Sequence, residues 1–159
     1  FRLSTGLMYF TFLQILLGAL VAGIDAGRGF PNWPLMTTGT GASFFPPEPF
    51  QLTPIWRNFF EDAGLVQFIH RISAYLLFIF GVLVWLRGRK SPNGQTRFGF
   101  NIMLAVLTLQ MVIGIVTVLY SAPVHIAIVH QFAAVLLWVA ILRGSYLARY
   151  PIPQSIRGK

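Results

Sequence analysis

The chain has 159 residues, of which 55% are hydrophobic and only 10% are charged. Soluble domains carry about 25% charged residues, so this composition argues against an ordinary soluble protein and indicates a membrane protein. The net charge of +8 does not indicate nucleic-acid binding, because the charges lie in the gaps between long apolar runs. The absence of cysteine excludes disulfides, thiolate metal sites and a covalently attached c-type heme.

Four apolar runs reach the length of about 20 residues that a membrane-spanning helix requires. We expect these helices at Thr5–Ile24, Ala63–Leu86, Phe98–Tyr120 and His125–Leu147. Strands are not expected, because the runs are long and do not alternate polar with apolar residues. Residues 25–62 are rich in proline, glycine and aromatic side chains, and we expect this outer loop to form a lid. The predicted fold is an all-α integral membrane four-helix bundle, one domain over residues 1–159.

The distribution of charge predicts how the bundle is oriented. The outer loop and its borders carry only two arginines together with all four acidic residues of the chain. The positive-inside rule therefore puts both termini and the short loop 87–97 on the cytoplasmic or matrix side, with residues 25–62 outside. The nine basic residues of the inner side are Arg2, Arg87, Arg89, Lys90, Arg97, Arg143, Arg149, Arg157 and Lys159.

Two pairs of segments repeat within the chain. "LQILLGALV" (Leu13–Val21) matches "LQMVIGIVT" (Leu109–Thr117), and "FIHRISAYLL" (Phe68–Leu77) matches "IVHQFAAVLL" (Ile128–Leu137). The sequence thus predicts two parallel helical-hairpin repeats related by an axis along the membrane normal. Short apolar motifs can also recur by chance, but two of the three histidines fall at matched positions, which favours a true repeat.

The repeat places His70 and His130 at matching depths on matching helices. Imidazole is a metal ligand, and two histidines facing each other in a helical bundle suit a heme iron with two axial ligands. Arg71 and, on the outer loop, Arg57 are candidates for binding the heme propionates. An alternative for Arg57 is an ion pair with Glu61, four residues later.

Other chemistries fit the two histidines less well, and the remaining polar residues of the spans have structural interpretations. Zinc is disfavoured, because it usually takes four ligands and the spans contain no cysteine or carboxylate to complete the set. A proton relay is disfavoured as well, because it normally uses Asp or Glu within the spans, where none occurs. His125 is rotated about 140° from the paired histidine of its own span, so we expect it at the interface. We expect Gln14 and Gln110 to make interhelical hydrogen bonds, and Gly18 and Gly114 to allow close packing.

The sequence resembles the heme A synthase family, in its proteobacterial and mitochondrial branch. The His-Arg of the second span and the His-Gln of the fourth are the most specific matches, and the resemblance runs over nearly the whole chain. The matching segments are "GFPNWPLM" (Gly29–Met36), "WRNFFED" (Trp56–Asp62), "LVQFIHRISAY" (Leu65–Tyr75), "LQMVIGIVTV" (Leu109–Val118) and "HQFAAVLLW" (His130–Trp138).

The resemblance implies an eight-helix protein in two homologous halves, of which this chain is the second, with a heme b between His70 and His130. The family's first half carries a catalytic glutamate three residues before its His-Arg. Gln67 stands there in this chain, so no catalytic residue is expected in it. The full-length enzyme would be an oxidoreductase of the bacterial or mitochondrial inner membrane. It would oxidise a methyl group of heme O, bound in the other half, to the formyl group of heme A.

The resemblance leaves open a homo-oligomer or a contact with heme O synthase, and the sequence does not specify an electron donor. Two other functions remain as alternatives. One is a standalone bis-histidine b-type cytochrome that transfers electrons, and the other is a membrane assembly or scaffold protein whose histidines only pack.

Overall fold

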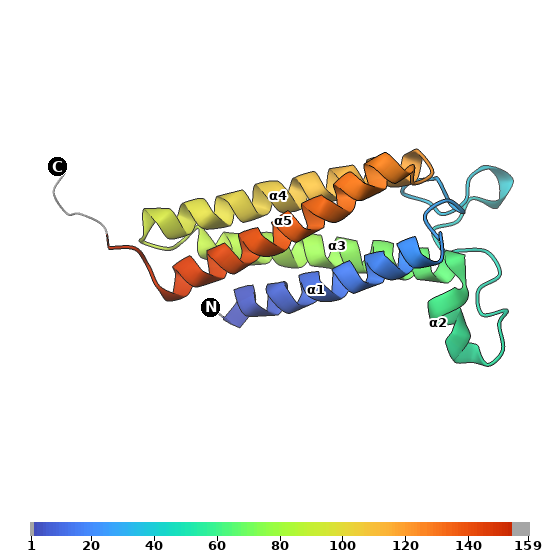
Figure 1. Cartoon of the computed structure of the whole chain (residues 1–159), viewed down its shortest axis with the longest axis horizontal. Coiled ribbons are helices and arrows are strands. Elements are labelled where there is room, and N and C mark those ends of the chain that lie inside the picture. Colours follow the sequence, from blue (N-terminus) through green and yellow to red (C-terminus); the bar gives the residue numbers. More distant parts are fainter. Residues whose placement is uncertain (1, 154–159) are drawn as a thin grey trace.

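A computed structural model describes residues 2–153, which fold into four long helices and one short helix (Figure 1). The long helices are α1 (Arg2–Gly23), α3 (Ala63–Gly88), α4 (Gly94–Leu119) and α5 (Val124–Arg149). The short helix α2 spans Asn58–Glu61, and within residues 2–153 the one β-type pairing is an isolated bridge in the outer loop. All four long helices are long and apolar enough to cross a membrane, so the prediction of an all-α membrane bundle is confirmed.

The start of α3 at Ala63 agrees with the prediction, and the other helix ends differ from the predicted ends by one to four residues, with the largest difference at the start of α4. This helix begins at Gly94 and not at Phe98, because the Asn93 side chain accepts a hydrogen bond from the Thr96 backbone N–H at 3.0 Å. Such a cap stabilises a helix start that hydropathy alone does not reveal. Asp62 caps α3 in the same way, through the backbone N–H of Leu65.

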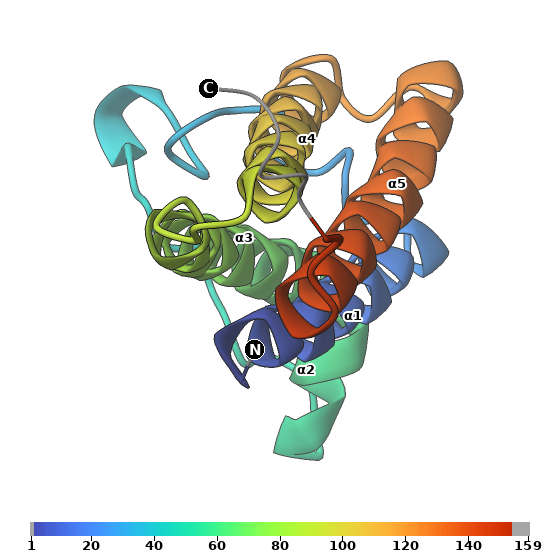
Figure 2. The same cartoon turned by 90° about the vertical axis from the view of Figure 1, so that its left-hand side faces the viewer.

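The four long helices surround one axis, and each packs against two neighbours (Figure 2). Helix α1 contacts α3 and α5, while α4 contacts α5 and α3. A buried apolar cluster fills the half of the bundle that carries the N-terminus of α1 and the C-terminus of α5. It consists of Leu7, Leu77, Val84, Phe100, Met103, Leu107, Leu137 and Ile141. The opposite half, next to the outer loop, holds both paired histidines.

The repeat predicted from the sequence is present in the backbone. Asp25 and Ser121 follow the ends of α1 and α4 with positive φ angles of 56° and 57°. One residue later, the N–H of Ala26 donates to the Val21 carbonyl at 2.9 Å. In the second hairpin, the N–H of Ala122 donates to the Thr117 carbonyl at 2.8 Å. The two hairpins, α1–α3 and α4–α5, therefore leave their first helix through the same turn.

The outer loop lies at the end of the bundle opposite the described termini (Figure 1). It contains α2 and is ordered around the buried side chain of Asn58. That amide accepts from the Leu52 N–H at 2.9 Å and donates to the carbonyls of Leu52 and Ile55, at 2.8 and 2.9 Å. A loop tied to one buried amide in this way has a defined shape, in agreement with the predicted lid.

The charges separate along the bundle as the sequence predicted. Both arginine–carboxylate ion pairs found among the described residues, Arg28–Asp25 and Arg57–Glu61, involve the outer loop. The other end carries the basic residues: Arg2 in α1, Arg87 in the last turn of α3, Arg89 and Lys90 in the α3–α4 loop, Arg97 in the first turn of α4, and Arg143 and Arg149 in the last two turns of α5. The predicted inner-side residues Arg157 and Lys159 lie outside the described residues.

Candidate functional site

The two paired histidines sit at equivalent places in the two hairpins. His70 lies about two turns into α3 and His130 about two turns into α5. A Cβ atom built on Gly18 of α1 would lie 3.1 Å from Cε1 of His70, and one on Gly114 of α4 would lie 2.9 Å from Cε1 of His130. Both glycines thus leave the space that an imidazole ring occupies, a more specific role than the close helix packing expected from the sequence.

A glutamine of the preceding helix holds the backbone of each histidine. Gln14 Nε2 donates to the His70 carbonyl at 3.0 Å, and Gln110 Nε2 donates to the His130 carbonyl at 3.0 Å. These are the interhelical hydrogen bonds that the sequence predicted. Since the same bond occurs in both hairpins, each histidine is fixed at its backbone from a neighbouring helix.

The two hairpins differ in how the imidazole itself is held. Gln14 Nε2 also lies 3.1 Å from His70 Nδ1, and the side-chain amide oxygen of Gln14, Oε1, accepts a hydrogen bond from the Ser73 hydroxyl. In the second hairpin, the amide oxygen of Gln110 and Nδ1 of His130 are buried without a hydrogen-bond partner. Buried polar atoms are nearly always paired, so this unpaired imidazole is a candidate for binding an absent group.

His70 and His130 occupy equivalent positions of the two hairpins and are the two imidazoles that this end of the bundle offers as ligands. Among residues 2–153 no group of three or more histidine, cysteine or acidic side chains could hold a metal ion. Two imidazoles suit a group that supplies the rest of its own coordination, as the macrocycle of a heme does.

Arg71 holds the outer loop onto α3. Its Nη1 donates to the carbonyls of Asn32 and Leu35, at 2.8 and 3.3 Å, and its Nη2 donates to the Phe30 carbonyl at 2.7 Å. Only 7% of the residue is exposed, and its Nε has no hydrogen-bond partner. Most of the guanidinium predicted to bind a propionate is therefore used to position loop residues 30–35.

Gln67 reinforces the same attachment from one turn earlier on α3. It is 1% exposed, and its Nε2 lies 3.4 Å from the Gly27 carbonyl and 3.5 Å from the Phe30 carbonyl. Its amide oxygen is buried without a partner. Gln67 and Arg71 lie on one face of α3 and together bind the segment of the loop that follows α1.

Arg57 is engaged away from the paired histidines. Its Nη2 lies 2.5 Å from Oε2 of Glu61, its Nε donates to the same carboxylate, and its Nη1 donates to the Thr53 carbonyl at 3.2 Å. The hydrogen bond and the charge of Glu61 raise the pKa of Arg57, and the same bond lowers the pKa of Glu61. This is the ion pair given above as the alternative to propionate binding.

The remaining site residues divide between those the sequence identified and those it missed. His125 lies exposed in the first turn of α5. Its expected place at the membrane interface stays a prediction. Ser73, which bonds to Gln14 and at 3.1 Å to the His70 carbonyl, was missed. Its position one turn after the histidine was the available signal, because a serine there can bond back to the carbonyl of that turn.

Known proteins match this chain over nearly its whole length. It is 62% identical to the heme A synthase of Ruegeria sp. (strain TM1040) over 158 residues, which is 99% of this chain and 40% of that protein. The heme A synthases of Roseobacter denitrificans and Paracoccus denitrificans (strain Pd 1222) are 62% and 50% identical, over 98% and 99% of this chain and 40% of each relative. The chain therefore spans about 40% of the length of these relatives. No solved structure matches it.

A family profile described as cytochrome oxidase assembly protein matches residues 1–142. This match covers all of α1, α3 and α4 and most of α5, including both paired histidines. The chain belongs to the cytochrome oxidase assembly protein family, among relatives that are named heme A synthase.

Proposed function

We propose that this chain is the heme-b-binding half of a heme A synthase. The full-length protein is then an oxidoreductase that converts the heme O methyl group to the formyl group of heme A. The observation that carries the proposal is the repeated arrangement of glutamine, glycine and histidine, which presents His70 and His130 alike from the two hairpins. The family of the chain and the names of its relatives supply the reaction.

In this proposal His70 and His130 would hold the iron of a heme b, which would supply reversible one-electron transfer when bound. Gln14 and Gln110 hold the backbone of the two ligands, and a second interaction that orients a metal-ligating histidine is typical of metal sites. The residues fit the group, because the unpaired Nδ1 of His130 belongs to a ring that ligand binding would engage. The apolar cluster in the other half of the bundle closes the site from that end.

Arg71 has two roles in this proposal. Its Nη atoms fix the loop over the outer end of α3, and its buried Nε is available to a heme propionate. The loop then shields the heme edge from water. Arg57 has less support as a propionate ligand, because its donors go to Glu61 and Thr53.

The proposal extends to the position of the chain in the cell and to its missing half. The basic end of the bundle faces the cytoplasm of a bacterium, or the mitochondrial matrix, and the outer loop faces the opposite side of the inner membrane. Heme O binds in the half of the full-length protein that this chain lacks. Gln67 supports this division, because it donates to loop carbonyls at the position where the other half is expected to carry a glutamate.

An absorption spectrum of the purified full-length protein tests the heme. We expect a reduced low-spin b-type spectrum from which His70→Ala and His130→Ala each remove one heme equivalent. His125→Ala is the matched control, because this exposed histidine lies on the same helix as His130 and should leave the spectrum unchanged. A protein without b-type heme, or one that keeps the full heme equivalent in both variants, would refute the site.

Heme extraction separates the synthase from an electron-transfer cytochrome. Cells that lack the full-length gene should lose heme A and accumulate heme O, and the wild-type gene should restore heme A. Unchanged heme A in the deletion strain would eliminate the synthase and leave the cytochrome.

A further inference from the structure

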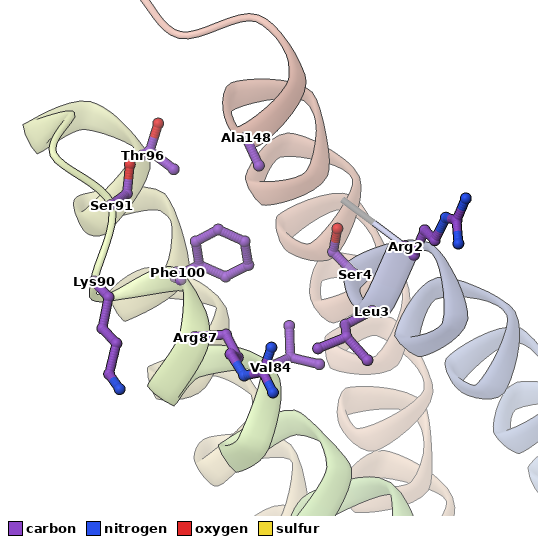
Figure 3. A pocket seen from close by; sticks show the side chains of 11 residues that line it. Arg2, Leu3, Ser4, Val84, Arg87, Lys90, Ser91, Thr96, Phe100 and Ala148 are labelled. Atoms are coloured by element: carbon purple, nitrogen blue, oxygen red, sulfur yellow. The ribbon is translucent and has the colours of Figure 1, made fainter.

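A cleft of about 590 Å³ lies at the basic end of the bundle, far from the histidines (Figure 3). The ends of the four long helices and the loop between α3 and α4 meet around it. Its volume is in the range of about 300–1,000 Å³ that is typical of sites for small molecules. The heme proposed above would lie between the histidines at the other end of the bundle and does not use this cleft.

The lining of this cleft joins an apolar floor to a basic rim. Leu3, Val84 and Phe100 contribute apolar side chains, and Val84 and Phe100 are almost fully buried. Arg2, Arg87 and Lys90 contribute three exposed cations from two separate parts of the chain. Figure 3 shows Arg87 beside Val84, with Lys90 on the α3–α4 loop to one side and Arg2 on α1 to the other, their charged ends directed outward. A ligand that fits both parts carries negative charge next to hydrocarbon.

No side-chain carboxylate of this chain neutralises the rim. The four acidic residues all lie in the outer loop or at its borders, at the opposite end of the bundle: Asp25, Glu48, Glu61 and Asp62. Three cations that no side-chain carboxylate of this chain neutralises lower their free energy by binding an anion, and the interface of a membrane offers lipid phosphates at this depth.

We propose that this cleft binds the headgroup of an anionic glycerophospholipid. Arg87 binds the phosphate, Lys90 and Arg2 add positive charge from the two sides of the cleft, and the first part of an acyl chain lies against Val84 and Phe100. The positive-inside rule explains why cations gather at this end of a membrane protein. It does not require those cations to surround an apolar cleft. Basic pockets between membrane helices commonly bind anionic lipids.

Lipid retention tests the proposal. The full-length protein is reconstituted in phosphatidylcholine vesicles containing phosphatidylglycerol and extracted with detergent, and the lipids that stay bound are measured by mass spectrometry. We expect phosphatidylglycerol to be enriched over its share in the vesicle. Arg87→Gln with Lys90→Gln should reduce the enrichment by about fivefold for each cation removed.

The matched control removes two charges from the same end outside the cleft, as Arg89→Gln with Arg143→Gln. It should keep the enrichment, and circular dichroism melting should show both double variants folded. An equal loss in both variants would overturn the proposal, since it would indicate a diffuse surface field. The melting temperature of the protein is also measured in pure phosphatidylcholine with inorganic phosphate. If inorganic phosphate raises this temperature as much as phosphatidylglycerol does, the proposal is overturned, because the ligand would then be free phosphate.

Discussion

Adding one methyl group at Gly114 provides a direct test of how the histidine site is built. The Cβ of Gly114→Ala would lie 2.9 Å from Cε1 of His130, whereas ordinary contacts begin near 3.4 Å. The imidazole must therefore move by about 0.5 Å, and such overpacking typically costs about 1–3 kcal/mol. If the bound heme fixes the ring in its present place, heme affinity should fall by about 5- to 150-fold.

Titrating the heme-free full-length protein with heme, and following the Soret band, measures this loss. Gly18→Ala should have the smaller effect, since its Cβ would lie 3.1 Å from Cε1 of His70 and the ring need move only about 0.3 Å. Gly23→Ala, at the end of α1, is the matched control, because a Cβ there meets nothing within 4 Å. Unchanged heme affinity and an unchanged spectrum in Gly114→Ala would refute the idea that these glycines set the position of the ligands.

Three further predictions concern the outer loop. Arg71→Gln should detach loop residues 30–35 and speed proteolysis of the loop, because each charged hydrogen bond that is not replaced removes about 1.5–3 kcal/mol of stabilisation from the attached loop. Proteolysis at the wild-type rate would contradict this. Asn58→Ala removes three hydrogen bonds from a buried amide and should lower the melting temperature, whereas an unchanged melting curve would show that the loop does not need the amide. Because Arg57 lowers the pKa of Glu61, the stabilisation by this ion pair is present above the ordinary carboxyl pKa and is lost as the pH falls through the lowered value. Wild type and Glu61→Gln should therefore differ in loop proteolysis at pH 7 and converge in acid, and a constant difference would be contrary to expectation.

The parts of the fold that the sequence predicted depend on sums over many residues. Hydropathy over about 20 residues located all four long helices. The largest error at a helix end lies at the start of α4, where one polar side chain, Asn93, caps the helix. The repeat was visible because its signature of glutamine, glycine and histidine occupies fixed positions on helices of known period.

The parts of the site that the sequence did not predict depend on contacts between distant segments. Nothing near Arg71 in the sequence shows that the carbonyls of residues 30–35 return to it, because this depends on the path of an irregular loop. The two imidazoles also have different surroundings, since His70 lies beside Gln14 and His130 is unpaired at Nδ1. The sequence repeat does not indicate this difference, because it matches the two histidines and the two glutamines alike. Regular elements and polar pairs at helical or repeated positions were thus predictable, whereas polar partners brought together by an irregular loop were not.

The attachment of the outer loop through Arg71 has a consequence for sequence variation. The acceptors on the loop are main-chain carbonyl oxygens, which every amino acid provides. The side chains of residues 30–35 can therefore change while the attachment is kept, provided that the backbone keeps its path. Arg71 has no such freedom, because a lysine has one nitrogen and does not reproduce the two-pronged geometry that reaches three carbonyls. The loop can thus acquire new contact residues for other molecules without losing its place above the bundle.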